Sequence, residues 1–271
     1  IMLAGFFIPK KVVSVSAMQN QNECSAKSMC VIEQTSKRVL MEKKKDERLP
    51  MASTTKVMTA LVALENCNDL DEVFPTDNRA VGIEGTSIYL RKDEKLSMRE
   101  LLYGLMLNSG NDAAMAIAYR IGKGKVEDFV DLMNEKAKEL KLENTHFDNP
   151  HGLDSKTHYT SSYDLAVITA KAMENKDFRE IVKTDIKEIS APKEMGHRFV
   201  RNKHKLLKSM IGCEGVKTGF TDNARRCCVT SCYRDGMRLI CVVLNCNDMF
   251  EESQKCLEKC YKDYHMEKVY E

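Results

Sequence analysis

The stretch 51-MASTTKVMTALVALE-65 places Ser53 and Lys56 three residues apart at the start of a run that is apolar on almost every side. A helix that is apolar all round belongs in the interior of a protein. Residues three apart lie on one helix face, so Lys56 can reach the hydroxyl of Ser53. The pair alone leaves two interpretations open, a helix cap beside a solvated lysine or a nucleophile beside its base. The same spacing recurs at 190-SAPK-193, where no other chemical residues surround it.

Helical patterns follow the opening run through the middle of the chain. The sequence 97-SMRE-100 is a capping box and predicts the start of a helix. Apolar spacing and polar caps predict four helices between the opening run and Thr184, at 98–107, 112–122, 125–140 and 161–173. An amphipathic helix is expected from about Glu251 to Tyr270.

Strand patterns lie on both sides of this helical block. Residues 28–44 read as two strands around a polar turn. Further strands are predicted at 185–190, 214–221, 227–234 and 237–245. The last two are joined by Asp235-Gly236, which is a strong hairpin signal. The predicted fold class is therefore α/β (α+β), with one antiparallel sheet of about five strands built from both chain ends and an inserted all-helical subdomain.

Composition limits the class of protein. The 271 residues are 43% hydrophobic and 30% charged, which is ordinary for a soluble globular chain with one sizeable domain. The net charge is only +2, whereas a nucleic-acid-binding protein usually shows a basic stripe or domain. We therefore expect no nucleic-acid partner.

The first residues indicate export. The apolar segment 1-IMLAGFFIP-9 is followed by Val15-Ser16-Ala17, a small-x-small pattern that predicts the remnant of a signal peptide over 1–17, cleaved after Ala17. A buried first strand or short helix is the alternative interpretation. The apolar segment is too short to span a bilayer by itself. The mature chain, 18–271, is expected to be exported and extracytoplasmic, with membrane attachment left undecided.

The eleven cysteines are an odd number for an exported chain that would pair them all. Their spacing lacks two matched C-x2-C pairs, so a structural zinc site is the weaker interpretation. Several of them occupy alternating strand positions, where cysteine acts as a small core residue. We expect no metal and no cofactor.

Three short motifs stand in order along the chain: Ser53-Thr54-Thr55-Lys56, Ser109-Gly110-Asn111 and Lys217-Thr218-Gly219. S-x-x-K with S-D-N and K-T-G is the signature of class A β-lactamases and penicillin-binding proteins. Here the middle motif has glycine in second place. Each motif is weak alone, but their order on a helix start, a loop and a strand is a strong signal.

The longer stretches 85-GTSIYLRKDEKLSMRELLYGLMLNSGNDAA-114, 146-HFDNPHGLDSKTHYTSSYDLA-166 and 214-EGVKTGFT-221 resemble the low-molecular-mass D-alanyl-D-alanine carboxypeptidases. These serine peptidases trim peptidoglycan stem peptides and are inhibited covalently by β-lactams. The resemblance covers nearly the whole mature chain and implies a β-lactamase/transpeptidase-like fold. It also implies that 18–271 is the catalytic domain, without the small C-terminal β domain that the family commonly adds.

The resemblance implies a role for each motif residue. Ser53 would form the acyl-enzyme, and Lys56 would take its proton as a neutral amine, because burial and a second cation at Lys217 lower a lysine pKa. Ser109 would relay a proton to the leaving amine, and Asn111 would hold Lys56 and the substrate amide.

The strand motif would bind the end of the substrate. Lys217 and Thr218 would hold the terminal carboxylate of a peptide ending in D-Ala-D-Ala. Gly219 would leave room for the peptide backbone, and the N–H groups of Ser53 and Phe220 would form the oxyanion hole.

Two alternatives remain open. A class A β-lactamase needs a glutamate that activates the deacylating water, and 143-ENTHFDNPHGLD-154 offers only Glu143. The second alternative is a non-catalytic relative that binds the cell wall, and two departures from the family pattern leave it open. Arg225 stands where the family usually has glycine, and the acidic residues Asp248, Glu251 and Glu252 stand near the place of a family arginine.

Overall fold

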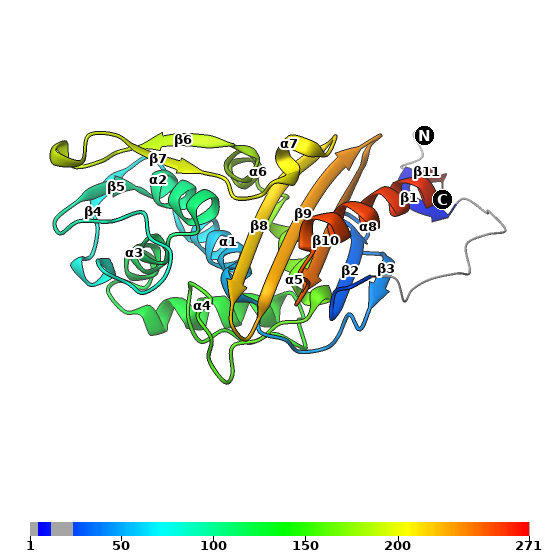
Figure 1. The fold of residues 1–271 in the computed structure, drawn as a ribbon, viewed down its shortest axis with the longest axis horizontal. Helices are drawn as coiled ribbons and strands as arrows, with labels where there is room; N and C mark the ends of the chain where they lie inside the picture. Colours follow the sequence, from blue (N-terminus) through cyan, green and yellow to red (C-terminus); the bar gives the residue numbers. More distant parts are fainter. Residues whose placement is uncertain (1–4, 12–23, 271) are drawn as a thin grey trace.

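The computed structural model describes residues 5–11 and 24–270 (Figure 1). Its centre is a five-stranded antiparallel sheet in the order β3-β2-β10-β9-β8. The N-terminal part supplies β2 (Ser28–Glu33) and β3 (Val39–Lys43). The C-terminal part supplies β8 (Cys213–Thr221), β9 (Arg225–Arg234) and β10 (Met237–Leu244). The predicted sheet from both chain ends is confirmed.

Helices cover both faces of the sheet. The helix α5 (Ser162–Ala172) packs on β2 and β10 from one side, and α8 (Met249–Asp263) packs on β9 and β10 from the other. The alternation along β2 follows this arrangement. Cys30 and Ile32 belong to the core shared with α5, whereas Met29 and Val31 belong to the core shared with α8. Side chains alternate between the faces of a strand, so β2 separates two apolar layers.

The middle of the chain forms the predicted helical subdomain, at the left of Figure 1. The helix α1 (Lys56–Asn66) runs from the sheet into this subdomain and contacts α3, α4 and α5. The other members are α2 (Met98–Tyr103), a π-helical turn η3 (Gly104–Asn108), α3 (Asn111–Ile121), α4 (Val126–Glu139) and α6 (Lys176–Lys183). The capping box predicted at Ser97 and Glu100 is present.

Small elements complete the described chain. They are β4 (Val73–Pro75), β5 (Lys95–Ser97), β6 (Ile186–Ile189), β7 (Arg198–Arg201), α7 (Leu206–Ser209) and the 3-10 turns η1 (Ala52–Thr55), η2 (Asn78–Ala80) and η4 (Lys193–Met195). The β6–β7 hairpin lies along the helical subdomain in Figure 1.

The prediction of a last helix extending to Tyr270 is wrong beyond Asp263. Residues Tyr264–Tyr270 form β11, which pairs antiparallel with β1 (Gly5–Lys11). The segment YHMEKVY contains aromatic and β-branched residues, which fit a strand, and pairing with the first described residues overrides the helical period. No helix in the described chain is long and apolar enough to cross a membrane.

The signal-peptide interpretation stays a prediction. Residues 5–11 form β1, while the expected cleavage point after Ala17 lies outside the described residues.

All eleven cysteines are free thiols in the structure. Cys228, Cys232 and Cys241 are fully buried in the layer between the sheet and α8, as their alternating strand positions predicted.

Candidate active site

Ser53 lies on the 3-10 turn η1, directly before α1 and beside β8. The approach between turn and strand is close. A Cβ added to Gly219 would lie 2.8 Å from the backbone nitrogen of Ser53 and 3.0 Å from the Cβ of Ala52. The first distance is shorter than real Cβ contacts and the second is unusually tight, so glycine allows β8 to pass this near to Ser53.

A second close approach holds the turn from the other side. Gly152 has φ +92°, and a Cβ there would lie 2.0 Å from the carbonyl oxygen of Ala52. Ala52 itself has φ +49°, an uncommon conformation for a non-glycine residue. The turn that carries Ser53 is therefore packed between β8 on one side and the loop around Gly152 on the other.

Lys56 is the centre of the polar contacts. Its side chain is fully buried, and its Nζ lies 3.0 Å from Ser53 Oγ, 2.7 Å from Asn111 Oδ1 and 2.6 Å from the carbonyl oxygen of His151. The motifs predicted that Ser53, Lys56 and Asn111 share one site, and in the structure Lys56 is hydrogen-bonded to both Ser53 and Asn111.

The electrostatics of the site lower two lysine pKa values. Burial is the largest cause that holds the pKa of Lys56 well below its ordinary value, followed by the charges of Lys217 and Lys203. Asp112 acts in the opposite direction. Burial, followed by Lys203, lowers the pKa of Lys217 to about 7. Both shifts favour neutral amines, as desolvation and neighbouring cations do in general.

The loop Ser109-Gly110-Asn111 has a strained geometry. The π-turn η3 ends at Ser109, which is left-handed at φ +67° and buried. A Cβ on Gly110 would lie 2.8 Å from Asp112 Oδ1 and 3.1 Å from Ile88 Cγ2. This contact explains why glycine takes the place of the aspartate in the usual motif. Ser109 is not among the hydrogen-bond partners of Lys56 in the described chain.

Asn111 is fixed in one orientation. Its Nδ2 donates to the carbonyl of Glu84 at 2.7 Å, and its backbone N–H donates to the carbonyl of Thr86 at 2.6 Å. Because Nδ2 faces an acceptor, Oδ1 must face Lys56.

Lys217, Thr218, Gly219 and Phe220 lie on β8, which is the last strand at its edge of the five-stranded sheet in the described chain. Lys217 is 2% exposed, and its Nζ donates to the carbonyl of Thr218 at 2.8 Å. Phe220 is 57% exposed. An edge strand offers unpaired backbone groups to an extended peptide.

Sequence reasoning missed the groups that reach the site through backbone atoms. The carbonyl of His151 is held by Asn149, whose Oδ1 accepts from the N–H groups of Gly152 at 2.7 Å and His151 at 3.3 Å. The 143–154 loop carried a recognisable motif, yet nothing in it indicated which carbonyl would meet Lys56.

The structure shows the backbone and the contacts of the residues that depart from the family pattern. Arg225 adopts φ +56°, so it stands where glycine would be unstrained. Glu252 is buried and accepts from the N–H of Ser25 at 3.3 Å, while Glu251 pairs with Lys255.

Fold and site together define a class, the serine-and-lysine enzymes of the β-lactamase-like fold. The model of the D-alanyl-D-alanine carboxypeptidase family matches residues 14–248, and this chain belongs to that family.

Individual relatives agree with this assignment. The chain is 34% identical over 90% of its length to D-alanyl-D-alanine carboxypeptidase DacF of Bacillus subtilis and covers 64% of that protein. It is 33% identical over 86% of its length to DacC of Escherichia coli and covers 60% of that protein. The chain thus spans less than two thirds of these curated relatives.

Solved structures agree as well. A Streptomyces DD-transpeptidase superposes with a TM-score of 0.81 at 32% identity, over 90% of this chain and 98% of that one. The D-alanyl-D-alanine carboxypeptidase DacD of Francisella tularensis gives 0.81 at 27% identity, over 92% of this chain and 72% of that one.

Proposed function

We propose that this chain is a serine-type D-alanyl-D-alanine carboxypeptidase. It removes the terminal D-alanine from peptidoglycan stem peptides through an acyl-enzyme on Ser53. The observation that carries the proposal is the set of three contacts around the buried Nζ of Lys56.

These contacts define what a neutral amine can do. The Oδ1 of Asn111 and the carbonyl of His151 can only accept hydrogen bonds. A neutral amine has two N–H bonds, and both are needed for these two oxygens at 2.7 and 2.6 Å. Its lone pair is then left for the hydroxyl of Ser53 at 3.0 Å. This is the geometry of a general base beside its nucleophile.

The other residues complete the reaction. Ser53 attacks the carbonyl carbon of the penultimate D-alanine, and its proton passes to Lys56. Asn111 orients Lys56 and the substrate amide, and Ser109 relays the proton to the departing amine of D-alanine. Water then attacks the acyl-enzyme and releases the shortened peptide.

Two features of β8 serve the substrate. Lys217 and Thr218 bind the terminal carboxylate, and the N–H groups of Ser53 and Phe220 stabilise the oxyanion. The close approach of Gly219 to the nitrogen of Ser53 supports this pairing of donors. Removing one such donor typically costs about 100- to 1000-fold in rate.

The proposed setting is extracytoplasmic, with residues 18–271 as the catalytic domain and a leader ending at Ala17. Penicillins would acylate Ser53 and deacylate slowly, because 143–154 offers only Glu143 as a candidate to activate water. No group of three or more His, Cys, Asp or Glu side chains placed to hold a metal occurs in the described residues, and the proposed chemistry uses none.

The test is mass spectrometry of a diacetyl-Lys-D-Ala-D-Ala digest. Loss of one D-alanine is expected with the wild-type chain and not with Ser53→Ala or Lys56→Met. The matched controls are Ser190→Ala and Lys193→Met, which alter the same S-x-x-K spacing at 190-SAPK-193 and should keep activity. Equal activity in Ser53→Ala and wild type would refute the proposal.

Covalent labelling separates the alternatives. A fluorescent penicillin should label wild type and not Ser53→Ala, whereas a non-catalytic relative would not be labelled. Rapid nitrocefin turnover would instead favour a β-lactamase.

Transpeptidation is a second candidate, because the Streptomyces structure matched over 98% of its length is named a DD-transpeptidase. In that case an amine acceptor added to the digest would be joined to the peptide in place of the released D-alanine. The same mass spectra report both products.

A further inference from the structure

Tyr89 has an unusual backbone and an unusual exposure. It is left-handed at φ +63°, and its side chain is 70% exposed. Its neighbours Ile88 and Leu90 are only 2% and 3% exposed. A bulky residue with positive φ is a genuine outlier. Such strain persists only where the surroundings impose it, and it clusters at active sites and ligand clamps.

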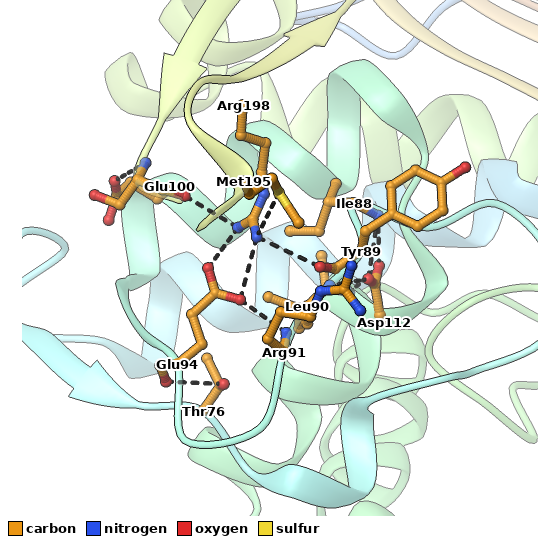
Figure 2. A network of polar contacts seen from close by, with 12 residues as sticks. Thr76, Ile88, Tyr89, Leu90, Arg91, Glu94, Glu100, Asp112, Met195 and Arg198 are labelled. Carbon is orange, nitrogen blue, oxygen red and sulfur yellow. Dashed lines mark hydrogen bonds and ion pairs between the residues drawn. The ribbon is translucent and has the colours of Figure 1, made fainter. Parts of the chain in front are cut away.

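The buried carboxylate of Asp112 imposes this conformation (Figure 2). It accepts from the N–H of Ile88 at 3.0 Å and from the N–H of Leu90 at 3.1 Å. It also accepts from the hydroxyl of Ser87 at 2.5 Å, and that oxygen in turn accepts from the N–H of Tyr89 at 2.7 Å. With both flanking amides turned toward one carboxylate, residue 89 bulges outward.

A buried ion pair holds the same loop from the β6–β7 hairpin. Arg198 of β7 donates to Glu94 at 2.7 and 3.2 Å and to the carbonyl of Tyr89 at 3.4 Å. Glu94 also accepts from the N–H of Arg91 at 2.9 Å. Figure 2 shows the ring of Tyr89 extending away from these contacts. The backbone is fixed on both sides while the ring remains free.

The fixed loop borders the proposed active site. Ile88 packs on Gly110, because a Cβ there would lie 3.1 Å from Ile88 Cγ2. The carbonyl of Thr86 accepts from the N–H of Asn111 at 2.6 Å, and the carbonyl of Ser87 accepts from Asn108 Nδ2 at 2.8 Å. Tyr89 therefore stands one residue from the side chain that packs against the Ser109-Gly110-Asn111 loop.

We propose that Tyr89 is a specificity-determining residue whose ring packs against the stem peptide on the amino-terminal side of the scissile bond. The inference rests on the proposed function. The peptide would lie between β8 and the Ser109-Gly110-Asn111 loop, and the ring would cover its backbone and aliphatic side-chain carbons. A tyrosine on a fixed backbone gives a large contact area at a small cost in side-chain entropy.

The experiment compares two reactions of Tyr89→Ala, Tyr89→Phe and Tyr89→Gly. The first is hydrolysis of a stem pentapeptide ending in D-Ala-D-Ala. The second is acylation by a penicillin nucleus that has a free amino group in place of its acyl side chain. We expect Tyr89→Ala to raise KM for the pentapeptide about tenfold, with kcat and the acylation rate by the bare nucleus within about twofold of wild type.

Two further variants separate contact from strain. Tyr89→Phe keeps the ring and should match wild type. Tyr89→Gly relieves the left-handed strain, so it should raise the melting temperature above that of Tyr89→Ala and yet show the same raised KM. The control is Tyr233→Ala, an exposed tyrosine on β9, which should leave both reactions unchanged.

The outcomes are distinct. A Tyr89→Ala enzyme within twofold of wild type in kcat/KM overturns the inference, and so does an equal loss in both reactions, which would mean a damaged site. A folded wild-type chain that neither releases D-alanine nor is acylated overturns the proposed function, and the inference with it.

Discussion

The sharpest test of the proton arrangement is Asn111→Asp. The replaced oxygen lies 2.7 Å from Lys56 Nζ, and both side chains are buried. Two unit charges at this separation attract by about 6 kcal/mol at an effective dielectric constant of about 20 and by about 1.5 kcal/mol in bulk water. These energies correspond to rises in the pKa of Lys56 of about four units and about one unit.

The assay is the pH dependence of acylation by benzylpenicillin. Neutral Lys56 is the proposed base, so the rate rises with pH through the pKa of Lys56, and the acid limb of the profile reports that pKa. We expect the acid limb of Asn111→Asp to lie at least about one unit higher than that of wild type, because a carboxylate favours the charged amine. On that limb the acylation rate at a fixed pH would fall about tenfold for each unit by which the pKa of Lys56 rises.

The control is Asn108→Asp. Asn108 is three residues earlier and donates to the carbonyl of Ser87 at 2.8 Å, without a contact to Lys56. Its replacement also exchanges an amide for a carboxylate near the site, so it reports any general effect of added charge. An acid limb that is unchanged in Asn111→Asp, or that moves equally in both variants, would refute the assignment of Lys56 as base.

Gly219→Ala should lower the acylation rate about 100-fold, because its Cβ would meet the nitrogen of Ser53 at 2.8 Å and push β8 away from the proposed oxyanion hole; a rate near wild type would contradict this. Lys217→Met should bind stem peptide more weakly and yet unfold at higher denaturant concentration at pH 7. The pKa of Lys217 is about 7 in the folded chain against an ordinary 10.5, so stability is lost as pH falls from above 10.5 toward 7, and removing the amine should restore about 4 kcal/mol at pH 7. Arg225→Gly should stabilise the β8–β9 turn by about 1 kcal/mol in urea unfolding, because φ +56° is strained for arginine and free for glycine.

The sheet and the longer helices could be predicted from sequence because the helices show an apolar period or caps and the strands show short apolar runs bounded by turn residues. The strands β2, β9 and β10 are buried along most of their length because one core layer lies on each face, so they appear in the sequence as short runs of buried residues, and Asp235-Gly236 marks the β9–β10 turn. The strand β11 could not be predicted, because its partner is β1, at the other end of the chain. The strand residues of YHMEKVY directly continue the amphipathic helical pattern of α8, so the sequence offered no turn signal that would end the helix before them.

The site was predictable to the extent that its chemistry resides in side chains. Ser53, Lys56 and Asn111 carry motif identities, and their meeting follows from the motif order. The carbonyl of His151 and that of Glu84 carry no sequence signal, because every residue has one. The glycine in Ser109-Gly110-Asn111 was visible as a departure, but its reason is the packing of Ile88 and Asp112 around it.

The proposed tasks of the two buried lysines are opposite. In the proposed reaction Lys56 must be neutral to accept a proton from Ser53, whereas Lys217 must be charged to bind a carboxylate. The charge of Lys217 is the second cause of the low pKa of Lys56, after burial, so a protonated Lys217 favours a neutral Lys56. A bound substrate carboxylate attracts the proton to Lys217 and so leaves Lys56 neutral when the nucleophile needs it. The pKa of Lys217 near 7 should therefore set the alkaline limb of kcat/KM, which reports the free enzyme, and this limb should move to higher pH in the profile of kcat, which reports the substrate complex. Coincident alkaline limbs in the two profiles would show that the carboxylate does not meet Lys217.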